Sequence, residues 1–100
     1  MTDIQTFIND NKEKITRLVG FDSNSSDDVE LVQTYIEAGI DDMIEAGVSE
    51  DVIVNKKLSI IALTQFVIDS LQETPGEYKT SSMYIQNVLK LKYMVVDDET

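Results

Sequence analysis

Carboxylates are the most abundant groups in this chain that could do chemistry. The 100 residues include 19 Asp and Glu, but no Cys and no His. The protein therefore has no thiolate nucleophile, no imidazole general base and no Cys/His zinc site. What remains is acid–base or metal chemistry by paired carboxylates, for which Asp27/Asp28 and Asp41/Asp42 are the candidates.

These carboxylates do not follow a catalytic or metal-binding pattern. Neighbouring residues on a helix point in different directions, so neither pair converges on one substrate atom. A calcium loop starting at Asp22 fails, because its sixth position would be Asp27 rather than Gly and its twelfth Gln33 rather than Glu. The sequence predicts that the protein is not an enzyme, and it predicts no catalytic residue, no metal and no cofactor.

The charge of the chain is strongly negative and uneven. The formal net charge is −11; residues 1–50 carry 12 acidic and 3 basic side chains, whereas residues 51–100 have a net charge of only −2. An acidic surface repels the phosphates of nucleic acids and anionic lipids, so we expect neither tight DNA binding nor membrane binding. The polar N-terminus does not resemble a signal peptide, and a soluble, cytoplasmic protein is the default expectation.

The elements that hold these carboxylates are organised around Leu58–Leu71, the most apolar segment of the chain. Its apolar residues surround most of a helical wheel, which predicts a helix that is buried on most sides. A buried strand is the competing interpretation, but strands are usually only about 4–8 residues long. The segment is also too short to span a bilayer, which takes roughly 20 apolar residues. We expect the helix to begin after an N-cap at Ser49 and to end near Gln72.

Two amphipathic helices are predicted in the N-terminal half. The first covers residues 3–19, although its polar centre at Asn9–Asn11 could break it. The second covers residues 28–46 and follows an N-cap within Ser26–Asp27.

Glycines mark the ends of these two helices and one interior point. Gly20 and Gly47 stand where a C-terminal glycine would stop each helix. Gly39 lies in the middle of the second helix, where it either permits a close helix crossing or is a weak point.

The C-terminal part contains a turn, a short helix and a tail. A proline–glycine turn is expected within residues 72–80, and a last helix from Ser82 to Tyr93. Residues 94–100 begin apolar and end acidic, which predicts a loose tail or a contact with a neighbouring subunit. Altogether, the sequence predicts one all-α domain over residues 1–100, a small bundle of four to five helices around a central apolar helix at about 50–72.

Three groups of side chains are candidates for contacts with other proteins. One group is the carboxylates of the second helix, here called the acidic face: Glu30, Glu37, Asp41, Asp42 and Glu45. Lys56 and Lys57 are the basic candidates, because they are the only bases of the predicted central helix. Tyr78, Met83 and Tyr84 flank the last loop and belong to types enriched in interface cores. Each group also has a simpler explanation, as solvated surface or, for the aromatic group, as the edge of the domain's own core.

The order of these elements resembles the head–tail connector, or adaptor, proteins of tailed bacteriophages and prophages. The similarity is carried by ITRLVGFDSNSSDDVELVQTYIEAGIDDMIEAG, the apolar LSIIALTQFVIDSL, the turn ETPGEYKT and the short helix SSMYIQNVLKLKYM. It covers nearly the whole chain but includes no catalytic motif.

The resemblance implies a structural protein of the virion, located at the head–tail interface and made in the cytoplasm of the bacterial host. Members of this family form a homo-oligomeric ring below the portal protein, extend the DNA channel and dock the stopper or tail-completion protein. The acidic face would then line the channel or meet bases of a neighbouring subunit, with Lys56 and Lys57 as partners. DNA would pass without sequence-specific binding. The isolated chain could still be a monomer.

Two other functions are compatible with the sequence. A small acidic phage regulatory module could mimic the charge of DNA and bind a basic protein, using the carboxylates of residues 28–45. An enzyme acting through metal-bound carboxylates would require magnesium or manganese binding, which no motif indicates.

Overall fold

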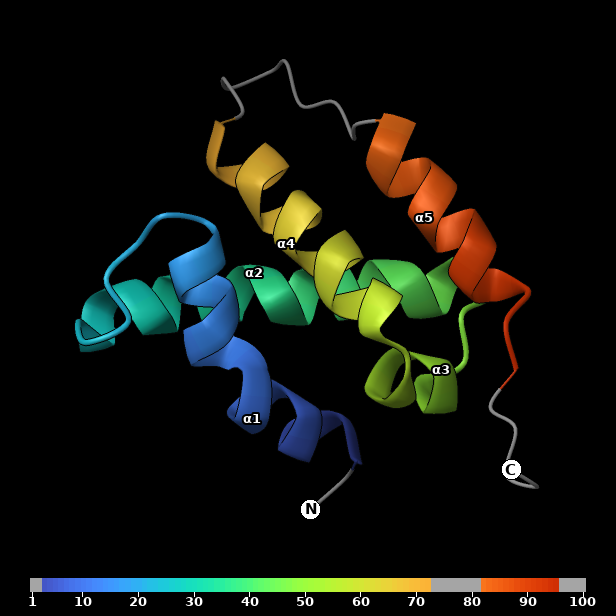
Figure 1. Ribbon diagram of the computed structural model, residues 1–100, viewed down its shortest axis with the longest axis horizontal. Helices are drawn as coiled ribbons and strands as arrows, with labels where there is room; N and C mark the ends of the chain where they lie inside the picture. The colour runs from blue at the N-terminus through green and yellow to red at the C-terminus, as the bar shows by residue number, and fades with distance from the viewer. Residues whose placement is uncertain (1–2, 73–81, 96–100) are drawn as a thin grey trace.

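Five α-helices make up the described part of the chain, which comprises residues 3–72 and 82–95 of the computed structural model (Figure 1). They are α1 (Asp3–Leu18), α2 (Ser26–Glu45), α3 (Glu50–Asn55), α4 (Lys57–Gln72) and α5 (Ser82–Lys92). These two ranges contain no strand. The predicted all-α class and small helical bundle are therefore confirmed. Most of the predicted turn, with Tyr78, and most of the predicted tail lie outside the described residues.

Helix α2 forms the back of the molecule, and the other helices lie on its front side. In Figure 1, α1 and α4 both cross in front of α2, and α5 lies beside α4. α4 packs against each of the four other helices. Its residues Leu63, Phe66 and Val67 are buried in the core. The central position predicted for the apolar helix is thus confirmed for α4.

The predicted continuous helix over residues 50–72 is wrong at one point. α3 ends at Asn55 and α4 begins at Lys57, because Lys56 between them has an extended backbone (φ −103°, ψ 128°). The buried hydroxyl of Ser59 lies 2.6 Å from the carbonyl oxygen of Ile53 and 2.7 Å from that of Lys56. Its single proton can be donated to either oxygen. The carbonyl of Lys56 also accepts from the backbone N–H of Ser59 (3.1 Å), so the hydroxyl is available to the carbonyl of Ile53, which a continuous helix would have paired with a backbone N–H group.

The burial of α4 also differs from the prediction on one side. Ser59 and Ser70 are buried although they are polar, whereas Ile61 is 55% exposed and Ile68 is half-buried. Among the described residues, no other helix covers the side of α4 that carries Ile61. The prediction from the helical wheel therefore placed more of the surface of α4 in the core than the structure does.

Serine hydroxyls cap two of the helices. The N–H of Asp28 donates to Oγ of Ser25 (3.3 Å), so Ser25, rather than the predicted Ser26–Asp27, is the N-cap of α2. Ser49 caps α3 as predicted, because its Oγ accepts from the N–H of Val52 (3.3 Å).

The possible break in the first helix does not occur, and both terminal glycines act as predicted. α1 is continuous through Asn9–Asn11. Gly20 and Gly47 follow α1 and α2 with φ of 91° and 104°, a region that favours glycine. The N–H groups of Phe21 and Val48 donate back to the last turn of each helix (3.0 Å). This is the usual C-terminal glycine arrangement.

Gly39 lies at a close crossing of α2 and α4. A Cβ atom at this position would be 2.8 Å from Cδ2 of Leu63 and 3.0 Å from Cδ1 of Phe66. Real Cβ atoms are essentially never found so near another carbon, so glycine permits this approach of the two helices. Of the two explanations offered by the sequence, the close crossing is the one that the structure confirms.

Candidate interaction surface

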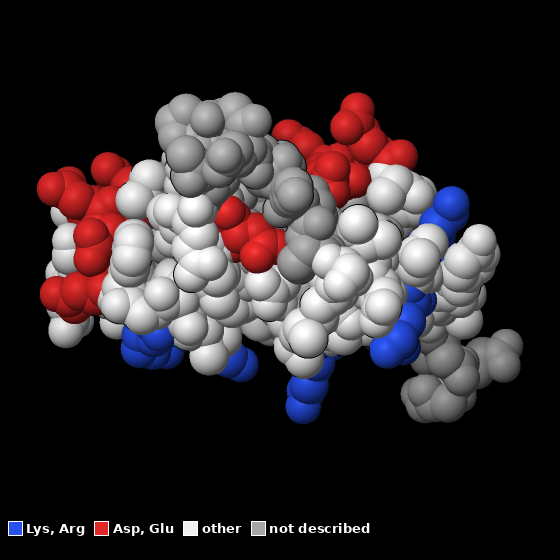
Figure 2. Space-filling model, turned by 90° about the horizontal axis from the view of Figure 1, so that it is seen from above, with Lys and Arg blue, Asp and Glu red and all other residues white. Residues whose placement is uncertain are grey.

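The acidic face lies on the back of the molecule. All five of its carboxylates are exposed on α2. The sequence contains no Lys or Arg between Arg17 and Lys56, so no base is available on α2 itself. Figure 2 shows Asp and Glu gathered along the edge formed by α2 and at the end where α2 begins, whereas Lys and Arg lie mainly along the opposite edge. The molecule is therefore electrically polar, with an acidic back and a more basic front.

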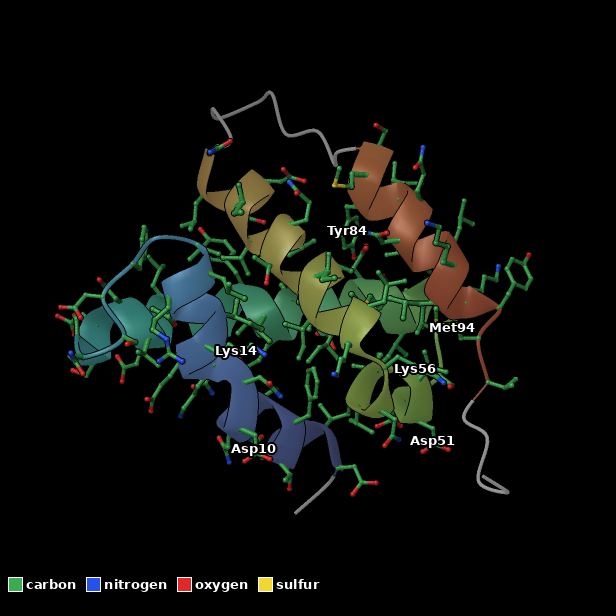
Figure 3. All side chains as sticks on the ribbon, in the orientation of Figure 1. Asp10, Lys14, Asp51, Lys56, Tyr84 and Met94 are labelled. Atoms are coloured by element: carbon green, nitrogen blue, oxygen red, sulfur yellow. The ribbon has the colours of Figure 1, made fainter. Side chains whose placement is uncertain are left out.

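One member of the acidic face has a structural partner. The hydroxyl of Tyr84 on α5 donates to Oδ2 of Asp42 (2.7 Å). Tyr84 is 2% exposed, and its ring packs against Phe66 with the ring centroids 5.4 Å apart. Figure 3 shows Tyr84 in the space between α4 and α5. Asp42 thus anchors α5 to α2, while the other four carboxylates remain on the solvent side of α2.

The structure places two of the candidates around the last loop, Met83 and Tyr84, in different environments. Tyr84 belongs to the domain's own core, so its burial does not fit a direct contact with another protein. Met83 next to it is exposed, and a contact role for it stays a prediction. Tyr78 lies outside the described residues. Met94 lies just after the end of α5 (Figure 3). Its side chain is partly buried and packs against the core.

The two basic candidates lie on the front side. Lys56 is half-buried at the break between α3 and α4 (Figure 3), whereas Lys57 is exposed in the first turn of α4. Because α2 is behind these helices, the two lysines and the outer carboxylates of the acidic face point to different sides. An interaction between them therefore requires a second molecule.

An apolar groove between α2 and α5 was not found from the sequence. It has a volume of about 310 Å³ and is lined by Asp42, Ala46, Tyr84, Ile85, Val88 and Leu89. We call it the α2–α5 groove. Ile85 and Leu89, one turn apart on α5, are 48% and 50% exposed. On a helical wheel of α5, Tyr84, Val88 and Leu91 lie on one side and Ile85 and Leu89 lie beside them, but all five are apolar or aromatic, so the wheel does not indicate which of them are buried.

A second uncovered surface follows the outer side of α4. Lys57, Ile61, Thr64 and Ile68 recur at helical spacing along it, and we call these residues the α4 stripe. The hydroxyl of Thr64 donates to the carbonyl of Ile60 (2.7 Å), so its proton is already hydrogen-bonded within the helix. The stripe is therefore mainly apolar, with one positive charge at its beginning.

Comparison with known proteins gives no relative. The chain matches no protein-family model, no curated protein and no solved structure. Functional conclusions therefore depend on the surfaces described above. Within residues 3–72 and 82–95, no three acidic side chains are placed to hold a metal ion, and no helix is long and apolar enough to cross a bilayer.

Proposed function

We propose that this protein is a structural component of a tailed-bacteriophage virion, a head–tail connector that forms a homo-oligomeric ring below the portal protein. The ring extends the DNA channel and docks the stopper or tail-completion protein. In this proposal the protein is not an enzyme and needs no cofactor.

The observation that carries the proposal is the presence of different uncovered surfaces on different sides of one small bundle. The back of α2 is acidic, and the α4 stripe and the α2–α5 groove expose apolar side chains. A protein with two unlike, complementary surfaces binds copies of itself head to tail, and such a contact closes into a ring when the rotation fits. The order of the helices, which resembles that of the connector family, supports the same assignment.

The acidic face suits a DNA channel. Carboxylates that line a ring repel the phosphates of DNA, so that the duplex passes without being held. Glu30, Glu37, Asp41 and Glu45 are the candidates for this role, because Asp42 is engaged by Tyr84. Lys57 is a better candidate for a contact between subunits than the half-buried Lys56.

The test is to look for this chain in purified virions of the phage or prophage that encodes it. We expect mass spectrometry to detect it and cryo-electron microscopy to place an all-α ring at the neck. The purified protein should also co-sediment with heads that carry the portal protein, and heads without the portal protein are the control. Absence from the virion together with no binding to portal-bearing heads would contradict the proposal.

A second candidate is favoured by one specific feature of α2. Its exposed carboxylates from Glu30 to Glu45 extend over about 22 Å without a base. Such a row could mimic DNA phosphates and bind a basic regulatory or nucleic-acid-processing protein. Competition assays separate the two functions, because a DNA mimic displaces DNA from its basic partner, whereas a connector binds the portal protein and leaves DNA-binding proteins unaffected.

A further inference from the structure

We infer that the α2–α5 groove of one copy receives the α4 stripe of a second copy. This inference rests on the self-association in the proposed function and assigns the two surfaces that make the contact. It names a second copy of this chain as the occupant of the groove.

Exposed apolar side chains support both halves of this contact. Ile85 and Leu89 on the groove and Ile61 on the stripe are each about half exposed. A groove of about 310 Å³ offers room for branched side chains such as Ile61 to enter beside Val88 and Ala46. Contact between the two surfaces would remove all three exposed side chains from water, which favours association.

Charge favours the pairing of groove with stripe, because only this pairing brings opposite charges together. Asp42 lines the groove, and Asp41 and Glu45 are exposed nearby on α2. The stripe begins with the exposed Lys57, one turn before Ile61. Pairing of two grooves would bring carboxylates of two copies together, and parallel pairing of two stripes would bring their Lys57 side chains together. Pairing of groove with stripe instead places Lys57 near carboxylates, and complementary charge specifies register and partner.

The two surfaces share no residue, so one copy can use both at once. The groove lies on α2 and α5, whereas the stripe lies on α4. A contact between unlike surfaces is heterologous and generates a ring or an open chain rather than a closed dimer. The expected assembly is therefore a series of copies with the same groove-to-stripe contact repeated.

The lack of cysteine in the chain permits a direct cross-linking test. Leu89→Cys and Ile61→Cys variants are purified separately, mixed in equal amounts and oxidised. We expect disulfide-linked dimers in the mixture and few in either variant alone. Leu18→Cys is the matched control, because Leu18 on α1 is 54% exposed, close to the value for Ile61. Equal cross-linking of Leu89→Cys with Leu18→Cys, or of Leu89→Cys with itself, would overturn the inference.

A charge-reversal experiment tests the same contact without a covalent bond. Lys57→Glu should weaken self-association by about fivefold, measured by sedimentation velocity, because it places like charges together. Adding Asp41→Lys should restore part of the loss. Circular dichroism checks that each variant stays folded. No change with Lys57→Glu, or no rescue by Asp41→Lys, counts against the proposed interface.

The outcomes separate this inference from the proposed function. A chain that is present in virions but does not cross-link between positions 61 and 89 is a connector with a different interface. A chain that stays monomeric and uncross-linked at millimolar concentration overturns the inference whatever its place in the virion. Groove-to-stripe cross-linking in a chain absent from virions supports the interface and contradicts the connector function.

Discussion

At the scale of single residues, Gly39 sets how closely the two main helices approach. A side chain here would meet Leu63 and Phe66, both of which are in the buried core. Helix propensity alone predicts that alanine would be better than glycine in the middle of α2 by about 1 kcal/mol. The crossing reverses this expectation, because the buried neighbours have little space into which they can move.

Gly39→Ala should therefore destabilise the protein by about 1 kcal/mol, and Gly39→Val by more, because overpacking outweighs the gain in propensity. Urea unfolding followed by circular dichroism measures the change. Ala38→Val on the exposed side of the same helix is the control for Gly39→Val and should cost only the lower helix propensity of valine, about 0.5 kcal/mol. A more stable Gly39→Ala variant would show that the crossing relaxes easily.

Tyr84 links α5 to α2 by its hydroxyl and to α4 by its ring. Tyr84→Phe keeps the contact with Phe66 but removes the bond to Asp42, so we expect a loss of about 1 kcal/mol of stability. Asp42→Asn should also destabilise the protein, whereas Asp41→Asn on the neighbouring residue should not. Thermal unfolding of these three variants checks the order, and equal effects at positions 41 and 42 would argue against the bond.

At the scale of elements, the ends of the helices are fixed by particular hydroxyl groups. Three consecutive polar residues, Ser25, Ser26 and Asp27, could each cap α2, and only the backbone geometry selects Ser25 (φ −92°, ψ 117°). Similarly, the hydroxyl of Ser59 lies within hydrogen-bond distance of the carbonyl of Ile53 in α3, at the break between α3 and α4. Hydrophobic periodicity does not detect such breaks, because the apolar pattern continues through them.

Ser25→Ala should destabilise the protein by about 1 kcal/mol, because the N–H of Asp28 loses its acceptor at the start of α2. The adjacent Ser26→Ala is a matched control and should be close to neutral. Chemical denaturation of both variants distinguishes them. A larger loss of stability for Ser26→Ala than for Ser25→Ala would indicate that Ser26 is the N-cap, as predicted from the sequence.

At the scale of the whole molecule, the distribution of charge affects stability and contacts more than the net charge does. The formal net charge is −11, and in the view of Figure 2 Asp and Glu gather along the edge formed by α2 and at the end where α2 begins. Like charges that are concentrated on one side repel one another and oppose folding. The opposite side of the molecule, which carries Lys57 and the rest of the α4 stripe, remains free for contacts with other molecules.

Salt should therefore stabilise the isolated protein. Raising the ionic strength from about 0.01 M to about 0.15 M shortens the Debye length from roughly 30 Å to roughly 8 Å, which screens repulsion along α2. We expect a higher midpoint of thermal unfolding at the higher ionic strength. The combined Glu37→Gln and Asp41→Asn substitutions should raise the midpoint at low salt and reduce its dependence on salt. A midpoint that falls with salt would mean that attractive ion pairs dominate instead.

The sequence by itself determined the helical class, the caps at Ser49 and Gly20, and the central place of Leu58–Leu71. These features depend on local backbone preferences and on apolar periodicity, both of which act over a few residues. The acidic face could also be located, because α2 has one apolar and one acidic side.

Only the tertiary structure decided which apolar residues are left outside the core. Ile61, Ile85 and Leu89 are chemically the same as buried neighbours, and their exposure depends on which side of each helix another helix covers. The break at Lys56 and the bond between Asp42 and Tyr84 likewise require partners six and 42 positions apart to meet. Contacts between residues distant in the chain follow from the packing of whole helices, which periodicity within one helix does not encode.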